Sequence, residues 1–322
     1  MRKILRYLLG ALLLGAFAAV HAQPYPSKPI RIVVPFPVGG IADLYSRIIG
    51  ARLTEAWGQP VLVENRAGAG GNIGADLVAK STPDGYTLVT GTVGTHAVNV
   101  SLFAKLPYDP VADFAPISLI AEADGLLVVH PSIPARSVAE LIAYARTKPG
   151  GLNFASAGMG TASHLSGELF KSMAKVEMAH VPYKGNVPAI TDLLAGQTAL
   201  IFATMPTVLP HAKAGKLRAL ASTGSARAAA TPELPTVAEA ALPGFDVTNW
   251  IGLFAPAGTP ADTVRRLNAE VARTMQSPDM KARLAGEGAR YYATTPEQFG
   301  AYVKAEIAKW APVVRASGAR VD

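Results

Sequence analysis

Cysteine is absent from the 322-residue sequence. This absence excludes a disulfide framework, thiol chemistry and attachment of a lipid to an N-terminal cysteine. Charged residues are also few, at 16% of the chain against 50% apolar residues, and this balance is typical of a compact globular protein. A chain of this length is most simply divided into two domains of ordinary size.

Long apolar runs are scarce, with one exception at the N-terminus. There, three basic residues precede an apolar segment over residues 8–20, and a small-residue cleavage signature ends at Ala22. The segment is shorter than a membrane span. Residues 1–22 are therefore predicted to be a secretory signal peptide that is cleaved before Gln23. The protein is expected in the periplasm, where the absence of cysteine suits the oxidising conditions.

An excess of charge of one sign is missing as well. The formal net charge of +7 falls to +4 without the three basic residues of the signal peptide. Lysines and arginines are scattered among acidic residues, and the pair Arg265 and Arg266 is their longest run in the mature chain. Nucleic-acid binding is therefore not expected, although a mild positive charge favours the capture of acidic small molecules.

The sequence motifs of common enzymes are missing too. The chain has no G-x-S-x-G elbow, P-loop, H-E-x-x-H or C-x-x-C pattern. The five histidines beyond the signal peptide have no partner at three- or four-residue spacing, so no metal site is expected. Ser163 and His164 are neighbours on a predicted helix and do not face each other, which weakens a serine–histidine nucleophile. Residues 68–74 resemble a dinucleotide-binding fingerprint, but Ile73 occupies the place of its third glycine, and no cofactor is expected.

Strand-like and helix-like segments alternate through most of the chain, which predicts an α/β fold with parallel sheets covered by helices on both faces. Extended segments are expected at residues 30–34, 61–64, 86–90, 116–121, 126–130, 179–183, 199–203, 217–222 and 250–254. The chain is predicted to cross to a second domain near residues 122–125. Domain I is expected to comprise residues 23–124 and 243–322, and domain II residues 125–242, with a hinge and a ligand cleft between the two lobes.

Three prolines in the last quarter of the chain, Pro260, Pro278 and Pro296, each follow a serine or threonine. A proline preceded by a hydroxyl side chain is typical of the first helical position after an N-cap residue. Helices are therefore expected to begin at these three prolines.

Two glycines follow the first predicted strand. Residues 30–34 are mostly aliphatic, two prolines then prevent further pairing, and apolar side chains recur at helical spacing from Ile41. Gly39 and Gly40 have no Cβ atoms, so a ligand can approach the free N–H groups of the first helical turn, where the helix dipole favours an anion. The alternative is that the two glycines only make a tight turn.

The same pattern occurs again in the second predicted domain. Residues 152–164 run from a short strand through small residues and two glycines, Gly158 and Gly160, into a helix. Two helix N-termini on different lobes can hold one anion from opposite sides. The small, hydroxyl-rich loop of residues 91–96 follows another strand, at the sheet edge where ligands bind in open α/β folds.

Three further residues have two interpretations each. The charge of Asp43 suits the helix dipole without any ligand, but if Asp43 faces the cleft it repels a carboxylate and receives an amine or a hydroxyl group. His164 is either a packing or polar wall residue of its first helical turn or the partner of Ser163 in a serine–histidine nucleophile, which is the weaker interpretation. Trp250 falls in a predicted crossing strand, so it lies either in the core or in the wall of the cleft.

Five short motifs carry a family resemblance. They are YPSKPIR at residues 25–31, PFPVGGIAD at 35–43, SAGMGTASHL at 156–165, VPYKG at 181–185 and APAGTP at 255–260. In this order they resemble the Bug-type periplasmic receptors of tripartite tricarboxylate transporters. The resemblance implies a type II periplasmic-binding-protein fold with two hinge-linked lobes, each with a mainly parallel sheet. It also implies a small carboxylate ligand, which is a di- or tricarboxylate, an amino acid or an aromatic acid, and its delivery to integral membrane subunits of a transporter.

The resemblance also implies which residues contact the ligand. By position they are Phe36, Gly39, Gly40 and Asp43 in the first loop, Ser156, Ala157, Gly158, Gly160, Thr161 and His164 in the second, and Thr92 and Thr95 in the loop that completes the pocket. Val38, Ala199 and Ala203 depart from the family pattern, the two alanines standing where relatives commonly have acids. A monomer is expected. The alternatives are a sensory receptor for a membrane signalling partner and a secreted enzyme that acts on an acidic substrate.

Overall fold

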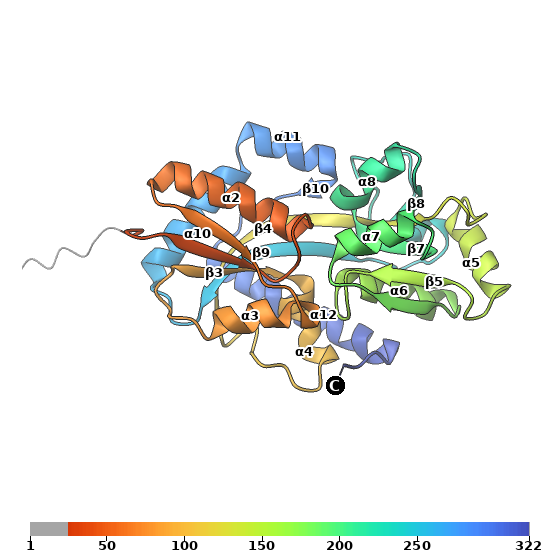
Figure 1. Cartoon of the computed structure of the whole chain (residues 1–322), viewed down its shortest axis with the longest axis horizontal. Helices are drawn as coiled ribbons and strands as arrows, with labels where there is room; N and C mark the ends of the chain where they lie inside the picture. The colour runs from red at the N-terminus through yellow and green to blue at the C-terminus, as the bar shows by residue number, and fades with distance from the viewer. Residues whose placement is uncertain (1–24, 322) are drawn as a thin grey trace, which may run out of the picture.

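The computed structural model describes residues 25–321, so the predicted signal peptide at residues 1–22 lies outside the described residues. The described chain forms an elongated molecule with two parts (Figure 1). Two long strands, β4 (Phe114–Val129) and β9 (Thr248–Pro256), run side by side from one part to the other. Within residues 25–321, none of the helices combines the length and the apolar character needed to cross a bilayer.

The strands form one hydrogen-bonded path in the order β2-β1-β3-β9-β4-β7-β5-β6, with β8 and β10 attached to β4. The first half-sheet contains the crossing strands together with β1 (Ile30–Val34), β2 (Val61–Asn65), β3 (Thr87–Thr92) and β10 (Ala289–Arg290). The second half-sheet contains the end of β4 together with β5 (Asn153–Ser156), β6 (Ala179–Pro182), β7 (Leu200–Thr204) and β8 (Arg218–Ser222). Among the described strands, every antiparallel pair involves β4 or β9, and the remaining pairs are parallel. The predicted parallel pairing is therefore confirmed within β2-β1-β3 and within β7-β5-β6. The expectation of mainly parallel sheets is not confirmed, because five of the nine pairs among the described strands are antiparallel.

Strand β4 changes its partners at Gly125. Its residues 114–124 pair with β9, whereas residues 125–129 pair with β7 on one side and β8 on the other. The prediction of two extended segments separated near residues 122–125 is wrong, since β4 continues through these residues. The strand can continue because the acidic side chains of Glu122 and Asp124 are held within the sheet. Arg290 on the neighbouring β10 donates hydrogen bonds to Glu122 (3.1 Å) and Asp124 (2.9 Å). The change of partners falls at the predicted domain boundary, and the division into domains stays a prediction.

Helices pack on both faces of the two half-sheets (Figure 1). In the first part they are α2 (Ile41–Trp57), α3 (Asn72–Ala79), α4 (Asn99–Leu102), α10 (Ala261–Met275), α11 (Pro278–Glu287) and α12 (Pro296–Ser317), with short turns η1 (Ala69–Gly71) and η2 (Gly94–Val98). In the second part they are α5 (Val138–Arg146), α6 (Ala162–Ala174), α7 (Asn186–Leu194), α8 (Met205–Lys213) and α9 (Val237–Ala240).

Two of the three helix starts predicted from proline are confirmed. Pro278 and Pro296 occupy the first positions of α11 and α12. The third prediction is one residue early, since Pro260 is the extended N-cap residue of α10. The hydroxyl group of the preceding Thr259 donates to the carbonyl of Pro256 (2.8 Å) and so does not cap the helix.

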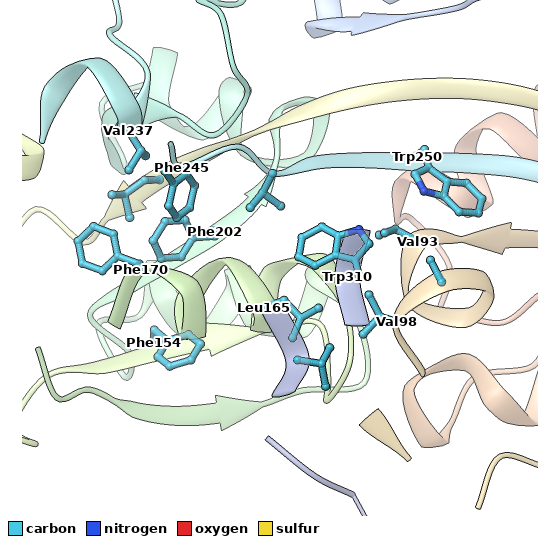
Figure 2. Close-up of a cluster of buried hydrophobic side chains, with 14 of the residues drawn as sticks. Val93, Val98, Phe154, Leu165, Phe170, Phe202, Val237, Phe245, Trp250 and Trp310 are labelled. Carbon is cyan, nitrogen blue, oxygen red and sulfur yellow. The ribbon is translucent and has the colours of Figure 1, made fainter. Parts of the chain in front are cut away.

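One apolar cluster extends through both parts of the molecule. Figure 2 shows Phe170, Phe202 and Phe245 gathered on one side of this cluster, and Trp250 on the other, with Trp310 of α12 between them. The indole N–H groups of Trp250 and Trp310 both donate to Glu306, at 3.0 and 3.1 Å. Trp250 therefore lies in the core, and the cleft-wall interpretation of this residue is wrong.

Candidate ligand-binding site

A cavity takes its wall from both parts of the molecule. The lining residues come from the loop between β1 and α2, the loop after β3, the crossing strands, and the starts of α6, α7 and α8. Its volume is about 770 Å³, including the open mouth. Hydroxyl and carboxamide groups interrupt an otherwise apolar wall, and none of the described lining residues is charged.

The N-terminus of α2 forms one side of the cavity. Gly40, Ile41 and Ala42 line it, next to Phe36 and Pro37. The first intrahelical bond is donated by Leu44 to the carbonyl of Gly40. The N–H groups of the first helical turn, at residues 41–43, therefore have no acceptor within residues 25–321. Together with the helix dipole, these donors make the N-terminus of α2 suited to a carboxylate.

Asp43 supports this loop from behind and does not line the cavity. Its carboxylate is buried and accepts hydrogen bonds from the Gly39 N–H (3.0 Å), from Asn65 (2.9 Å) and, through two nitrogens, from Arg47 (3.0 and 2.8 Å). Burial by itself raises the pKa of Asp43, but the bonds from Arg47, Gly39 and Asn65 outweigh it and hold the pKa below its usual value. The structure thus favours the interpretation of Asp43 as a structural anion of the first helical turn.

The N-terminus of α6 forms another side of the cavity. Ala157, Thr161, Ala162 and Ser163 line it, and the Thr161 hydroxyl caps the helix by accepting from the N–H of His164 (3.5 Å). Most N–H groups of the preceding loop donate within the loop itself. Ala157 donates to the Ser163 hydroxyl (2.9 Å), Gly158 to the Ser156 hydroxyl (3.1 Å) and Gly160 to His164 Nδ1 (3.2 Å). The donors left for a ligand on this side are the N–H groups of Ala162 and Ser163, to which nothing within residues 25–321 is bonded.

Two stacked imidazoles lie behind this second loop. The rings of His164 and His180 are 4.2 Å apart, and His180 Nε2 lies 2.6 Å from the Ser156 hydroxyl. Burial lowers the pKa of His164 to about 4, with a smaller contribution from the charge of Lys171. Burial likewise lowers the pKa of His180 to about 3. Both rings are therefore neutral at pH 7 and fix the loop through uncharged hydrogen bonds.

The residues proposed from the sequence divide into two groups. Those that line the cavity are Phe36, Gly40, Thr92, Ala157 and Thr161. Those that lie beside the lining residues, outside the wall, are Gly39, Asp43, Thr95, Ser156, Gly158, Gly160 and His164. Members of the second group hold members of the first in place. The hydroxyl group of Thr95, for example, accepts a hydrogen bond from the N–H of Thr92 (3.0 Å).

A third helix N-terminus, that of α7, also lines the cavity and is missing from the predicted site. Gly185, Asn186 and Val187 contribute to the wall at this point. The motif at residues 181–185 ends at this helix start, so the sequence contained a signal for it. Besides carrying the family resemblance, the motif leads from β6 into α7 and so forms a third strand-to-helix turn at the same cavity.

The floor of the cavity comes from positions that no motif in the sequence marks. It is formed by Gly125, Phe202–Thr204 of β7, Thr223, Val247 and Asn249. Ala203 is among these residues, whereas Ala199 is not, and Val38 is an exposed residue outside the wall. Floor residues are separated widely along the chain and share no motif, so only the folded structure brings them together.

Glycines bring the two parts of the molecule into close contact around the cavity. A Cβ atom on Gly185 would lie 2.9 Å from the ring of Pro37, and one on Gly39 would lie 3.3 Å from Val187. Elsewhere, a Cβ atom on Gly70 would lie 2.6 Å from the carbonyl oxygen of Met159. Loops from the two parts of the molecule thus touch beside the cavity, and a side chain at Gly39, Gly70 or Gly185 would separate them.

The Gly-rich residues 68–74 have a packing role in this structure. They do not line the cavity. A Cβ atom on Gly71 would lie 2.6 Å from Thr95, and one on Gly74 would lie 2.9 Å from Pro35, so these glycines let α3 approach the loop after β1. In the part of the chain that the structure describes, no group of His, Asp and Glu side chains is arranged to hold a metal ion.

Two α/β lobes joined by crossing strands, with helix N-termini from both lobes at one cavity, define a periplasmic binding protein. Solved structures agree with this class. The chain superimposes on Rpa4515 of R. palustris, described "with adipate", with a TM-score of 0.90 at 41% identity, covering 92% of this chain and 100% of that one. It also superimposes on MatC of Rhodopseudomonas palustris, described "with bound malate", with a TM-score of 0.86 at 38% identity, covering 90% and 100%.

The sequence identifies the family. The model of the tripartite tricarboxylate transporter family receptor, TctC, matches residues 45–319, and the chain belongs to this family. Protein BugT of Bordetella pertussis is 39% identical over 308 residues, which are 95% of this chain and 94% of BugT. The predicted resemblance is thereby confirmed. The family consists of solute-binding receptors and not of enzymes, so the enzyme alternative is set aside.

Proposed function

We propose that the protein is a periplasmic receptor that captures a small carboxylate between the N-termini of α2 and α6 and delivers it, as a monomer, to the integral membrane subunits of a tripartite tricarboxylate transporter. The predicted signal peptide and the family support a periplasmic location. Two structures of related proteins are described with adipate and with malate, which supports carboxylates as the ligand class.

The observation that carries this proposal is the meeting of unbonded helix N-termini at one uncharged cavity. N–H groups of α2 and of α6 come from different parts of the molecule and line the same space. A carboxylate placed there receives hydrogen bonds from both, and each helix adds a partial positive charge of about half an elementary charge. Charged hydrogen bonds of this kind contribute about 1.5–3 kcal/mol each.

The charge of the cavity narrows the ligand class. None of the described lining residues is acidic, and Asp43, the nearest acidic residue of the first loop, has all its partners behind the wall. An ammonium group on the ligand would meet helix N-termini without a counter-ion. Carboxylates without an ammonium group, such as dicarboxylates, hydroxy acids or aromatic acids, therefore fit better than amino acids.

We further propose that the receptor works by hinge closure between domain I, residues 23–124 and 243–322, and domain II, residues 125–242. The change of partners of β4 at Gly125 supports this division. The close approach of Gly185 to Pro37 and of Gly39 to Val187 supports closure of the two lobes over a ligand.

The test is a thermal-shift panel of carboxylic acids, amino acids and neutral sugars with the mature protein. A ligand at 100 times its dissociation constant stabilises the folded state by about 2.7 kcal/mol, which raises the melting temperature measurably. We expect shifts with carboxylates and smaller shifts, or none, with the matching amino acids. Shifts with neutral sugars and none with any carboxylate would refute the proposal.

A further inference from the structure

Most polar side chains of the cavity wall already have partners in the protein. The hydroxyl groups of Thr92, Thr161, Ser163, Ser166, Thr204 and Thr223 all make hydrogen bonds to other groups of the chain. Thr223 illustrates this, because it donates to the carbonyl of Val247 (2.7 Å) and accepts from the N–H of Gly125 (2.8 Å). Because each hydroxyl has a single hydrogen to donate, and an acceptor for it lies within the chain, these groups have little left to donate to a carboxylate.

Asn249 differs from these residues. Val247, which directly precedes β9, and Asn249 of the strand line the cavity, while Thr248 faces Asp124 (3.5 Å) and Trp250 faces the core. Only the backbone of Asn249 lies in the sheet, opposite Ala123 of β4. Its half-buried carboxamide makes no hydrogen bond within residues 25–321. The fold therefore does not use this donor and acceptor pair, which lies at the cavity wall.

Asn186 is the other carboxamide of the wall. Its Nδ2 atom lies 3.5 Å from the Thr204 hydroxyl, at the upper limit of a hydrogen bond, and its Oδ1 atom is buried without a partner. The two polar atoms of an amide are interchangeable by rotation, so in either orientation one of them has no partner within the described chain. A buried polar atom without a partner is costly, and a ligand group can remove that cost.

We propose that the carboxamides of Asn249 and Asn186 are specificity-determining contacts, which bind a second polar group of the carboxylate ligand. The inference rests on the proposed function, since it assumes that one carboxylate is held at the helix N-termini. A carboxamide both donates and accepts without carrying charge, so it fits a hydroxyl group or a second carboxylate. A site built for such a group discriminates against an analogue that lacks it.

The experiment compares matched acids by calorimetric titration of the mature protein. The two sets are butyrate, 4-hydroxybutyrate and succinate, and hexanoate, 6-hydroxyhexanoate and adipate. We expect Asn249→Ala to weaken the hydroxy acid and the dicarboxylate of the preferred length by at least about tenfold, and the alkyl acid by less than about threefold. Asn186→Ala is expected to weaken the same two ligands.

Asn249→Asp provides the sharper distinction. The new carboxylate accepts a bond from a hydroxyl group but repels a second carboxylate, so binding of the dicarboxylate is expected to fall further than binding of the hydroxy acid. Gln276→Glu, an exposed position outside the cavity, adds the same charge and is the control, with no change expected. Unliganded melting temperatures check folding, and Asn249→Ser replaces the alanine variant if that variant does not fold.

Two results are distinguishable from the expected one. If the wild type binds the acids but each Asn249 variant changes all three members of a set by the same factor, or changes none, the inference is overturned and the proposed function stands. If the wild type binds none of the six acids, the carboxylate proposal fails for these chain lengths and the inference fails with it.

Discussion

Gly40 is the residue of the first loop at which a substitution separates binding from folding most clearly. Its φ is −77°, and the nearest atom to an added Cβ would be the carbonyl oxygen of Pro37 at 3.9 Å. We expect Gly40→Val to reduce ligand affinity at least about 100-fold, because the side chain enters the space that Gly40 lines, and to shift the melting temperature by less than about 2 °C. Calorimetric titration and thermal melting measure the two effects.

Two other glycines serve as comparisons. Gly151→Val changes an exposed position outside the cavity, with only ordinary contacts to Lys148, and is expected to leave binding unchanged. Gly158→Val is expected to destabilise the fold, since φ is +127° and a Cβ would lie 2.9 Å from the carbonyl of Tyr183. Equal loss of folding by the variants at positions 40 and 158 would show that both loops are only structural turns.

The buried histidines predict a loss of stability in mild acid. Burial holds the pKa of His164 at about 4 and that of His180 at about 3, below the ordinary value of 6.5. A pKa lowered by folding means that the folded state favours the neutral ring, so this stability is complete above pH 6.5 and is lost as the pH falls toward 4. The loss approaches about 1.4 kcal/mol per pH unit for each ring.

Urea unfolding at pH 7.0 and pH 5.0 measures this loss. His180→Phe retains a ring for stacking on Phe154 but removes one titrating group, so its stability is expected to fall less than that of the wild type between the two pH values. An equal fall in both proteins would mean that folding does not lower the pKa of His180.

At the scale of residues, the sequence predicted which positions build the site better than which positions face the ligand. The dipole argument placed Asp43 at the first turn correctly. Its bonds from Gly39 and Arg47 are local, but its bond from Asn65 depends on the neighbouring strand β2. Asn249 had no local signal at all. A polar residue in a strand pattern does not reveal whether its side chain lies in a cavity or in solvent.

Among the secondary-structure elements, α12 has the clearest structural role. It packs against β4, and Glu306 on it accepts hydrogen bonds from the indoles of Trp250 and Trp310. We expect Glu306→Ala to destabilise the protein by about 2–4 kcal/mol, because two buried N–H groups lose their acceptor. Glu306→Gln retains an acceptor oxygen and is expected to lose less. Urea unfolding monitored by tryptophan fluorescence measures both, and identical losses would contradict the hydrogen-bond explanation.

At the scale of elements, strands and helices that begin at strong local signals were predicted well. The strand-to-helix turns at β1 and β5 are examples, as are the proline-initiated starts of α11 and α12. Strand β4 is a single strand where two extended segments are predicted, and Glu122 and Asp124 continue it between them. Their partner Arg290 lies far along the chain, so local sequence contained no indication of the pairing.

For the whole molecule, approach of the two parts depends on glycines at their contact. Gly70 has φ +64°, and a Cβ there would lie 2.6 Å from the carbonyl oxygen of Met159. We expect Gly70→Ala to weaken ligand binding at least about tenfold, because the lobes no longer approach fully. Small-angle scattering is expected to show a smaller ligand-induced decrease in the radius of gyration than in the wild type.

Gly150→Ala is the matched control. Gly150 has a similar φ of +69°, yet no atom lies within 4 Å of an added Cβ. The control therefore introduces the same backbone strain without the contact between the lobes. If both variants bind and contract alike, strain and not lobe contact explains the effect of Gly70→Ala.

The position of β9 in the sheet has a consequence for the biosynthesis of the protein. Strands β3 and β4 follow each other along the chain but do not pair, because β9, at residues 248–256, lies between them. A nascent chain cannot complete its central sheet until β9 has left the ribosome, and contacts this distant in sequence form slowly. The strand order thus leaves the central sheet incomplete until most of the chain has been made, which agrees with the proposed export to the periplasm.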